Sequence, residues 1–581
     1  MSGEERRIYE DLVFLYGEES AQVYAPRLLN RLAAFRSEHP DLAAASSKDR
    51  FSERDAILIS YGDMVSAPGE ASLRTLANFL KKHVGGAISG VHLLPFFPFS
   101  SDDGFSVVDY KKVDSLLGAW SDIAHMGESY RLMFDAVVNH ISAKSEWFRA
   151  FLRDDPAYRH HFLEITPDMD VSRVFRPRAL PLETAVLTPS GQKTVWTTFS
   201  ADQVDLNYRS PQLLLDVLDV LLTYVDKGAE FIRLDAIAFI WKESGTNCLH
   251  LPQTHRIIQL MRKVLDSVAP GVSIITETNV PHQDNISYFG DGFNEAQMVY
   301  NFSLPPLTLH AFQTGNAEAL SEWADTLNLP SSQTTFFNFL ASHDGIGVTP
   351  ARGFLPDEAI VAMGKRVENL GGYVSNKSNP DGSRSPYELN INYLDALGDP
   401  EVKNEPIATL AQRFLASQAI MLALRGVPGI YFHSLFGSRS WPQGAQQTGR
   451  HRTINRQKLS LSQIEKDLFD TTSLRYQVFQ GYLNMLKQRI TNAAFHPTGE
   501  QSVLFCNKSV FALRRIALDG VRQVICLHNL SNLTTRVEIA AKDISTPDGN
   551  VLVDLLGGRR VKIGNGVLAL ELRPYEVLWL A

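Results

Sequence analysis

The sequence predicts an α/β protein built on a (β/α)8 TIM barrel, with two inserted subdomains and a C-terminal antiparallel β domain. Three observations predict it. Eight short β-rich runs alternate with helical patterns, two connections are too long for a simple barrel, and the pattern changes to clustered β-formers after about residue 490. The chain has 581 residues, 44% of them hydrophobic, which is enough for a large core.

The chain begins with a helical pattern. Residues 1–54 are rich in Glu, Arg, Leu and Ala with helical periodicity, so we expect a helical N-terminal extension packed on the main body. The barrel is then assigned to residues 55–140, 209–344 and 406–489.

The barrel assignment depends on the alternation of strands and helices. Helical patterns over 71–83, 211–227, 252–268 and 406–424 separate runs that are typical of buried parallel strands. The expected strands are 56–61, 90–96, 131–139, 230–235, 272–277, 297–302, 336–344 and 427–432.

Two connections exceed the usual length of a βα loop. Residues 141–208 carry Pro, Arg and Trp and are interpreted as an inserted subdomain B, and residues 345–405 as a second, loop-rich inserted subdomain B′. Active sites of (β/α)8 barrels lie at the carboxyl ends of the strands, so both insertions are expected to lean over the site. Residues 490–581 show clustered β-formers with turns between them and predict the C-terminal β domain.

Composition and charge exclude several classes of function. The formal net charge is −8, with no block of like charge, so neither nucleic acid nor a membrane is expected as a partner. The three cysteines have neither a disulfide pattern nor metal-ligand spacing, and apolar runs are broken before they reach about 18 residues. With no apolar signal segment after Met1, the cytoplasm is the expected location.

The stretch EFIRLDAIAF, residues 230–239, places two opposite charges in an apolar strand. Arg233 and Asp235 are two residues apart, so their side chains point to the same face. Buried charge is costly unless it is paired, and the pair therefore indicates a function at the end of this strand.

Acidic residues close three of the predicted strands, namely Asp235, Glu277 and Asp344. Each alone is more often a helix cap or a loop residue, but three on one rim favour catalysis. Paired carboxylates suit glycosidic chemistry, in which one attacks the anomeric carbon and another protonates the leaving oxygen. Arg233 is expected to lower the pKa of Asp235, and the apolar VSII before Glu277 to raise the pKa of that residue.

Four motifs occur in a specific order: DAVVNH (135–140), RLDA (233–236), ETN (277–279) and SHD (342–344). This ordered set resembles the conserved regions of the α-amylase family, glycoside hydrolase family 13. The resemblance implies Asp235 as nucleophile, Glu277 as general acid and base, and Asp344 as transition-state stabiliser. It also implies that His140, Arg233 and His343 line a glucose subsite.

A narrower resemblance covers nearly everything after residue 55. The runs HLLPFFPFSSDDGFSVVDY, RPRALP, VWTTFSADQVDLNY, SHDGIG and TINR are similar to the sucrose phosphorylase subgroup. This resemblance implies that Asp102 and Arg452 bind the far hydroxyls of glucose and that Phe105 and Phe199 form its apolar walls. Arg178 and Tyr387 would bind phosphate. Without the resemblance, Arg178 would be interpreted as a solvated loop cation and the phenylalanines as core aromatics.

The segment SNKSNPDGSRSPYELNINYLDAL resembles the glucosylglycerate phosphorylase branch of that subgroup. It carries Lys377 and Arg384, which we expect to attract the carboxylate of glycerate. The leading hypothesis is therefore a retaining phosphorylase that converts 2-O-α-glucosyl-D-glycerate and phosphate into α-D-glucose 1-phosphate and D-glycerate.

Three alternatives stay open: a sucrose or sucrose 6′-phosphate phosphorylase, an α-glucoside hydrolase, and a non-catalytic, partner-binding member of the family. No cofactor and no metal are expected, since inorganic phosphate is a substrate and no oxygen-ligand cluster is visible. The expected partners are the small-molecule sugar and phosphate, and the resemblance implies a homodimer.

Overall fold

The computed structural model describes residues 3–46, 50–178, 180–378 and 383–581. Eight parallel strands close a barrel in the order β1-β16-β12-β11-β10-β9-β4-β3, which confirms the predicted fold class. Each of the eight predicted strand runs overlaps one barrel strand. They are β1 (Ile57–Ser60), β3 (Gly90–Leu93), β4 (Arg131–Ala136), β9 (Ala229–Leu234), β10 (Ser273–Thr276), β11 (Met298–Tyr300), β12 (Thr335–Phe339) and β16 (Val427–Tyr431).

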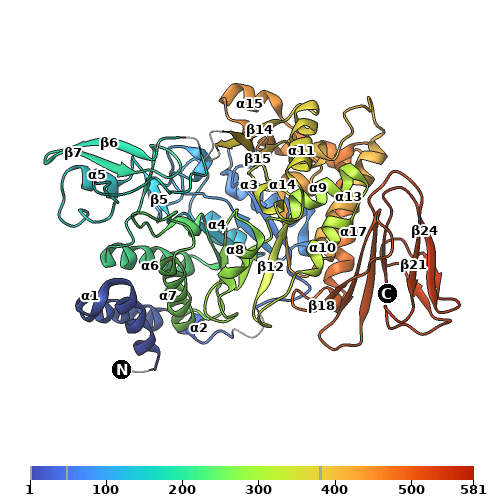
Figure 1. Cartoon of the computed structure of the whole chain (residues 1–581), viewed down its shortest axis with the longest axis horizontal. Helices are drawn as coiled ribbons and strands as arrows, with labels where there is room; N and C mark the ends of the chain where they lie inside the picture. Colours follow the sequence, from blue (N-terminus) through green and yellow to red (C-terminus); the bar gives the residue numbers. More distant parts are fainter. Residues whose placement is uncertain (1–2, 47–49, 179, 379–382) are drawn as a thin grey trace.

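Helices surround the barrel, as Figure 1 shows. In helix α6 (Pro211–Asp226), the Ser210 hydroxyl accepts the Leu213 N–H and Pro211 occupies the first turn, so the helix starts where the sequence predicts. The other helices of the barrel are α3 (Ser72–His83), α4 (Trp120–Gly127), α7 (Pro252–Val268), α8 (His282–Ile286), α9 (Leu304–Thr314), α10 (Glu318–Asp325), α13 (Ile407–Ala423), α14 (Phe432–Leu435), α15 (Pro442–Thr448), α16 (Leu461–Phe469) and α17 (Leu474–Ile490).

The N-terminal segment forms helix α1 (Gly3–Glu38), which bends at Gly17, and the short helix α2 (Pro40–Ala43). Gly17 has a φ of 79°, a conformation that favours glycine. Helix α1 lies beside α6 and α7 in Figure 1. The buried Asp11 joins it to α7 through Arg256 at 2.9 Å and Lys263 at 2.5 Å.

The first insertion contains strands β5 (His140–Ser142), β6 (Glu183–Thr188), β7 (Gly191–Trp196) and β8 (Gln203–Asp205) and helix α5 (Glu146–Leu152). Strand β5 pairs with β8 in antiparallel register, with His140 opposite Asp205. The β6–β7 hairpin projects from the molecule at the upper left of Figure 1. The insertion is thus attached to the end of barrel strand β4 by its own small sheet.

The second insertion is more regular than expected, and the description of it as loop-rich is wrong. Strands β13 (Ile346–Gly347), β14 (Tyr373–Ser378) and β15 (Arg384–Asn390) form a three-stranded sheet, next to helix α11 (Asp357–Asn369). Helix α12 (Tyr393–Ala396) follows. Helix α11 buries Ile360, Met363 and Val367 at helical spacing. The sequence interpretation missed this pattern because it relied on the Gly- and Ser-rich stretch that follows the helix.

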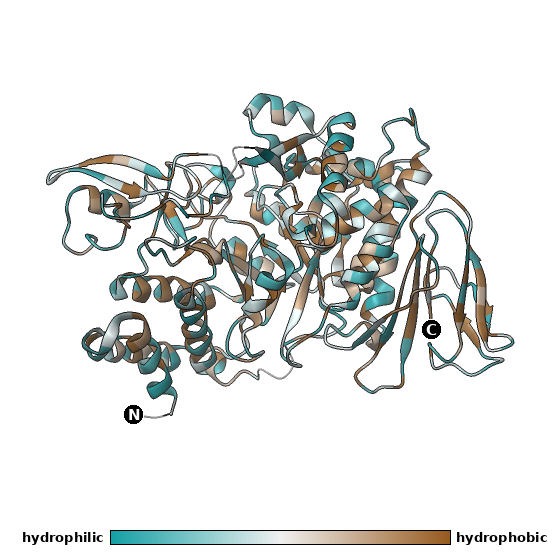
Figure 2. Cartoon of the chain, viewed as in Figure 1, coloured by the Kyte–Doolittle hydropathy of each residue, from teal (hydrophilic) through white to brown (hydrophobic). Residues whose placement is uncertain are grey.

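The C-terminal domain is antiparallel, as predicted. One sheet has the order β18-β19-β20-β25, and two further pairs, β21-β24 and β22-β23, pack with it around a core of its own. The brown inner strands at the right of Figure 2 show this core. Its strands are β18 (Glu500–Val503), β19 (Val510–Ile516), β20 (Gln523–Asn529), β21 (Thr535–Ala540), β22 (Val551–Val553), β23 (Arg560–Lys562), β24 (Val567–Leu572) and β25 (Val577–Leu580).

Two short strands remain, β2 (Val65–Ser66) and β17 (Leu459–Ser460), which pair with each other beside the barrel. Among the described residues, no helix has both the length and the apolar character needed to cross a membrane.

Candidate active site

A cavity of about 750 Å³ lies where the barrel strands end, between the two insertions. Strand ends, the first insertion and the second insertion all contribute to its lining. The predicted site residues that line it are Asp102, Phe105, His140, Arg178, Phe199, Asp235, Glu277, His343, Asp344, Tyr387 and Arg452.

Arg233 lies behind the cavity, between two carboxylates. Its guanidinium donates to Asp235 Oδ1 at 2.8 Å and also to Asp135 Oδ1, on the neighbouring strand β4. Asp135 is directly opposite Arg233 in the sheet register and also contacts His92 Nε2 at 2.8 Å. Burial raises the pKa of Asp135, but Arg233 and His92 outweigh burial and lower that pKa to about 2. The two charges of the β9 strand are therefore part of a buried, paired network.

Asp135 was missed by the sequence reasoning, although its signal was the same as for Asp235. It is a carboxylate inside the apolar run RLMFDAVVN, at the position that faces Arg233 across the sheet. Because sequence alone does not give the register between strands, this pairing could not be assigned.

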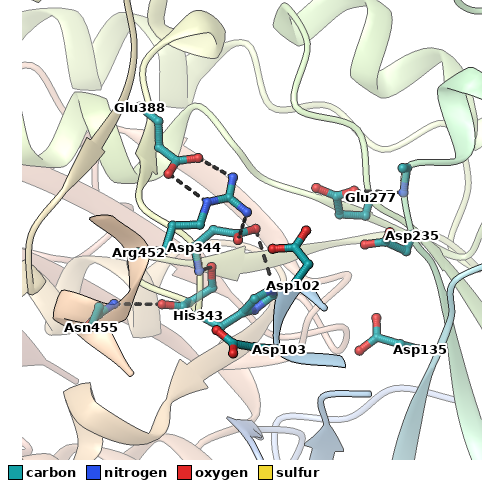
Figure 3. Close-up of polar contacts among 12 residues, drawn as sticks. Asp102, Asp103, Asp135, Asp235, Glu277, His343, Asp344, Glu388, Arg452 and Asn455 are labelled. Atoms are coloured by element: carbon teal, nitrogen blue, oxygen red, sulfur yellow. Dashed lines mark hydrogen bonds and ion pairs between the residues drawn. The ribbon is translucent and has the colours of Figure 1, made fainter. Parts of the chain in front are cut away.

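Glu277 lies beside Asp235, and Figure 3 shows the two carboxyl groups next to each other. Its Oε2 accepts the backbone N–H of Ala236 at 3.0 Å, and its Oε1 is 3.9 Å from Arg233 Nη2. Ala236 has a φ of 50°, a strained conformation for a residue with a Cβ. The turn at Ala236, directly after the predicted nucleophile Asp235, points the Ala236 N–H towards Glu277.

Burial dominates the acid–base properties of this pair. Burial raises the pKa of Asp235 well above its usual range; Arg233 opposes it, and the carboxylates of Glu277, Asp135 and Asp344 add to it. Burial also raises the pKa of Glu277. The expectation that Arg233 leaves Asp235 with a low pKa is therefore wrong, because burial and like charges outweigh one cation.

The raised pKa values favour one proton on the pair. Arg233 donates directly to Asp235 but is 3.9 Å from Glu277, so it stabilises charge on Asp235 more than on Glu277. The proton therefore belongs on Glu277, which leaves an ionised Asp235 and a neutral Glu277.

Asp344 has the opposite surroundings. Burial raises its pKa, but the cations around it, first Arg452 and then others including Arg456, hold the pKa well below its usual range. Arg452 Nη1 is 2.5 Å from Asp344 Oδ1, and the same guanidinium donates to both oxygens of Glu388, at 2.9 and 2.5 Å. Figure 3 shows Arg452 between Asp344 and Glu388. Asp344 is thus ionised at neutral pH.

Glu388 and Arg456 are site residues that the sequence reasoning did not assign. Arg456 donates to the His343 carbonyl at 2.7 Å, lies 3.4 Å from Asp344 Oδ1 and pairs with Asp103. Glu388 directly follows Tyr387 on β15, and Arg456 is the last residue of the TINR motif. Neither residue had a sequence signal of its own that indicated a role.

Rings line the part of the cavity predicted to hold glucose. Phe105 and His343 are stacked, with centroids 4.7 Å apart and planes at 7°, and Phe199 is 5.2 Å from His140. Burial lowers the pKa of His343 to about 3, so this imidazole is neutral.

Arg178 reaches the cavity from the first insertion. Its Nη2 is 2.9 Å from Asp102 Oδ2, and its guanidinium lies over the Phe199 ring at 5.4 Å from the centroid. Burial raises the pKa of Asp102, but Arg178, Arg452 and Arg456 outweigh burial and leave the pKa well below its usual range. The predicted phosphate-binding cation and the predicted glucose-binding carboxylate are therefore paired with each other in this structure.

Lys377 and Arg384 do not line the cavity, so the structure contradicts their expected position over the acceptor. Strand β14 has an irregularity between Ser375 and Asn376, and these two residues line the cavity in succession. Lys377 is turned away, with Arg352 and Asp357 as its charged neighbours, and Arg384 is exposed. No sequence feature indicated this irregularity in β14, which determines the direction of Lys377.

Over the residues that the structure describes, no group of three or more His, Cys, Asp or Glu side chains is arranged to hold a metal ion. The expectation of a reaction without metal or cofactor stays a prediction. The carboxylates of the cavity are instead neutralised by arginines.

Comparisons with known proteins agree with this geometry. Residues 80–349 match the catalytic domain of the α-amylase family. The chain is 49% identical to a glucosylglycerate phosphorylase of Spirochaeta thermophila, over 99% of this chain and 98% of that protein. It is 44% identical to a glucosylglycerate phosphorylase of Escherichia coli (strain K12), over 99% of this chain and 100% of that protein.

More distant relatives extend the comparison. A sucrose phosphorylase of Streptococcus mutans is 28% identical over 83% of this chain and 96% of that protein. The crystal structure of sucrose 6F-phosphate phosphorylase from Thermoanaerobacter thermosaccharolyticum has a TM-score of 0.71 at 24% identity, covering 82% of this chain and 94% of that chain, which shows the shared fold. The chain belongs to the α-amylase family and, within it, to the group that contains these glucosylglycerate phosphorylases.

Proposed function

We propose that the chain is a retaining glycoside phosphorylase that transfers glucose from 2-O-α-glucosyl-D-glycerate to inorganic phosphate. The products are α-D-glucose 1-phosphate and D-glycerate. One observation carries the proposal: three carboxyl groups with different electrostatic surroundings line one cavity together with Arg178, in a chain 44–49% identical to glucosylglycerate phosphorylases.

The first half-reaction cleaves the glycosidic bond. An oxygen of ionised Asp235 attacks the anomeric carbon, the bond from that carbon to the glycerate oxygen breaks, and Glu277 gives its proton to that oxygen. A glucosyl ester on Asp235 and free D-glycerate result. The positive charge that develops on the sugar is offset by the nearby carboxylates.

The second half-reaction repeats this geometry in reverse. A phosphate oxygen attacks the anomeric carbon, the ester bond to Asp235 breaks, and ionised Glu277 takes the phosphate proton. Two inversions restore the α configuration. Phosphate is already a nucleophile, so the enzyme must mainly position it and exclude water.

Arg178 and Tyr387 support the phosphate step in this proposal. A guanidinium can pair with two phosphate oxygens, and Arg178 reaches the cavity with 31% of its side chain exposed. It must then leave Asp102, which becomes free to accept glucose hydroxyls. Tyr387 lines the same cavity with its hydroxyl protonated, since burial raises its pKa well above the usual range.

The remaining expectations stay predictions. The cysteines of the described structure are free, which fits a reducing cytoplasm, and no cofactor enters the two steps above. The sugar and phosphate are the proposed partners. The predicted homodimer can be tested by measuring the molecular mass of the protein in solution.

The test uses the reverse reaction. The protein is incubated with α-D-glucose 1-phosphate and either D-glycerate, fructose or fructose 6-phosphate, and phosphate release is measured. We expect the highest kcat/KM with D-glycerate. A higher value with fructose or fructose 6-phosphate would assign a sucrose or sucrose 6′-phosphate phosphorylase instead.

Two further outcomes reject the proposal in different ways. Glucose release from the glucoside that does not depend on added phosphate indicates a hydrolase. No turnover of any of these donors indicates a non-catalytic member of the family.

A further inference from the structure

Lys242 is a buried cation that the two half-reactions above do not use. It follows strand β9 by a short loop, and its side chain is 3% exposed. Its ammonium group is 2.6 Å from Asp205 Oδ2 and donates to Asn139 Oδ1 at 2.8 Å. The side chain of Asp205 and the residue Asn139 are both fully buried. A buried lysine is costly in free energy unless it is paired. The buried Lys242 and its partners therefore indicate a role, as the buried Arg233 and its partners do.

The two partners of Lys242 come from different parts of the fold. Asn139 follows barrel strand β4, and Asp205 ends strand β8 of the first insertion. Lys242 itself belongs to the loop after the strand that carries Asp235. The ammonium group therefore joins three segments that meet at the cavity.

Asn139 transmits the contact to His140. Because Asn139 Oδ1 accepts from Lys242, its Nδ2 is the donor end of the amide: it donates to Asp205 Oδ2 at 3.2 Å and lies 3.2 Å from His140 Nδ1. A donor at Nδ1 places the histidine proton on Nε2, which lies 2.9 Å from the Phe105 carbonyl at the cavity wall. Lys242 and Asp205 together thus orient the Asn139 amide, which, with the Phe105 carbonyl, sets the tautomer of a residue lining the predicted glucose subsite.

Asp205 transmits the contact to Phe199. Its Oδ1 accepts the Thr198 N–H at 2.7 Å and its Oδ2 accepts the Thr198 hydroxyl at 2.7 Å. The next residue, Phe199, lies under the Arg178 guanidinium and beside His140. The same ammonium group is therefore coupled to the sugar side and to the phosphate side of the cavity.

We propose that Lys242 is a positioning residue of this active site, whose ammonium group between Asn139 and Asp205 sets the orientation of His140 and of the Phe199–Arg178 wall. This proposal rests on the proposed function only for the identity of the natural substrates. At metal sites, replacing a residue that orients a metal ligand commonly costs 10- to 100-fold in activity, and we expect an effect of the same order here.

The test combines truncation with chemical rescue. Lys242→Ala removes the side chain beyond Cβ, and n-propylammonium has the shape and charge of the missing part, whereas n-propanol has nearly the same shape without the charge. Turnover of α-glucosyl fluoride, which needs the glucose subsite and Asp235 but no acceptor specificity, is measured alongside phosphorolysis. We expect kcat/KM to fall by about 100-fold and to recover at least tenfold with n-propylammonium only.

Two further variants separate positioning from stability. In Lys263→Met the ion pair between Lys263 and the buried Asp11 is lost far from the cavity, and we expect a lowered melting temperature with unchanged kcat and KM. Asn139→Asp keeps an acceptor for Lys242 but cannot donate to His140, so we expect a raised KM for the glucosyl donor in a folded protein.

The outcomes decide the proposal independently of the substrate. Unchanged kinetic constants in Lys242→Ala, equal recovery with the alcohol and the ammonium ion, or no recovery with either would overturn the positioning role. If wild-type enzyme cleaves the fluoride but does not act on glucosylglycerate, the proposed function fails while the rescue experiment still tests Lys242.

Discussion

The two walls of the cavity are built differently. The barrel wall carries Asp135, Arg233, Asp235 and Glu277 on or directly after adjacent strands, and each is nearly buried. The insertion wall carries Arg178 of the first insertion, with 31% of its side chain exposed, and Tyr387 of the second insertion. Because strands hold side chains more rigidly than loops, the difference assigns bond cleavage to the barrel wall and the choice of acceptor to the insertions. Substitutions should therefore have larger and less substrate-dependent effects on the barrel wall.

The largest effect is expected at Asp235. Asp235→Asn removes the nucleophile, and we expect kcat to fall by at least about 10⁴-fold with every donor, since an essential group is lost. Steady-state and single-turnover kinetics measure this. A variant that keeps more than about a hundredth of wild-type turnover would contradict the assignment.

The same variant also has a predicted effect on stability. A carboxyl whose pKa is raised in the folded state binds its proton more tightly there, so its ionisation costs stability as pH rises above its unfolded value. Asn cannot ionise, and Arg233 keeps Asp135 as a partner. We therefore expect a higher melting temperature for Asp235→Asn at pH 7, with the difference shrinking towards pH 4.

The next effect depends on the leaving group. Glu277→Gln removes the general acid, and we expect a loss of about 10²- to 10⁴-fold with the glucoside. With α-glucosyl fluoride, whose leaving group needs no proton, formation of the ester should be nearly normal. Equal losses with both donors would indicate that Glu277 holds structure and does not supply the proton.

On the insertion wall, the effect should depend on phosphate. Arg178 pairs with Asp102, which is not one of the three catalytic carboxylates. In Arg178→Gln we therefore expect the KM for phosphate to rise about 100-fold while ester formation from α-glucosyl fluoride changes little. Burst kinetics with the fluoride separate the two steps. A slower burst with an unchanged phosphate KM would place Arg178 in the first half-reaction.

The pH dependence sharpens the description of the barrel wall. Asp235 must be ionised, and its pKa is raised, so kcat/KM should fall about tenfold per pH unit below a value higher than that of an ordinary aspartate. Glu277 is neutral in the active form, as glutamine is in Glu277→Gln. Assayed with the fluoride, this variant should therefore keep the acidic limb near its wild-type position; a shift of that limb by more than about one pH unit would contradict the assignment of the proton to Glu277.

The smallest effect is expected at Lys377 and Arg384. Both lie outside the cavity lining, so Lys377→Ala and Arg384→Ala should change the KM for D-glycerate by less than about threefold, as exposed charges usually do. A tenfold rise in that KM in either variant would show that the second insertion closes over the acceptor during turnover.

The sequence predicted the barrel wall better than the insertion wall, for physical reasons. Strands such as 230–235 are recognised by their apolar character, and parallel strands in a barrel necessarily bring their carboxyl ends to one rim, so Asp235, Glu277 and Asp344 could be placed together without coordinates. The resemblance to a known family then supplied Asp102, Arg178 and Arg452.

What could not be predicted depends on register and on strand irregularities. The partner of Arg233 is Asp135 because β4 and β9 align at these residues, and Lys377 is turned away because β14 is irregular two residues earlier. The pKa of Asp235 was predicted with the wrong sign, since a sequence shows the neighbouring arginine but neither the burial nor the other carboxylates. Helix α11 was hidden by the adjacent Gly- and Ser-rich stretch.

The central claim is that glucose is held on Asp235 between its donor and phosphate. The direct measurement is mass spectrometry of peptides from Glu277→Gln after reaction with α-glucosyl fluoride in the absence of phosphate. We expect one glucosyl group on the peptide that contains Asp235, and its slow release as α-D-glucose 1-phosphate when phosphate is added, since phosphate is a nucleophile but the glutamine of this variant cannot take its proton. A glucosyl group on any other residue, or no glucosyl group on the protein, would contradict the account.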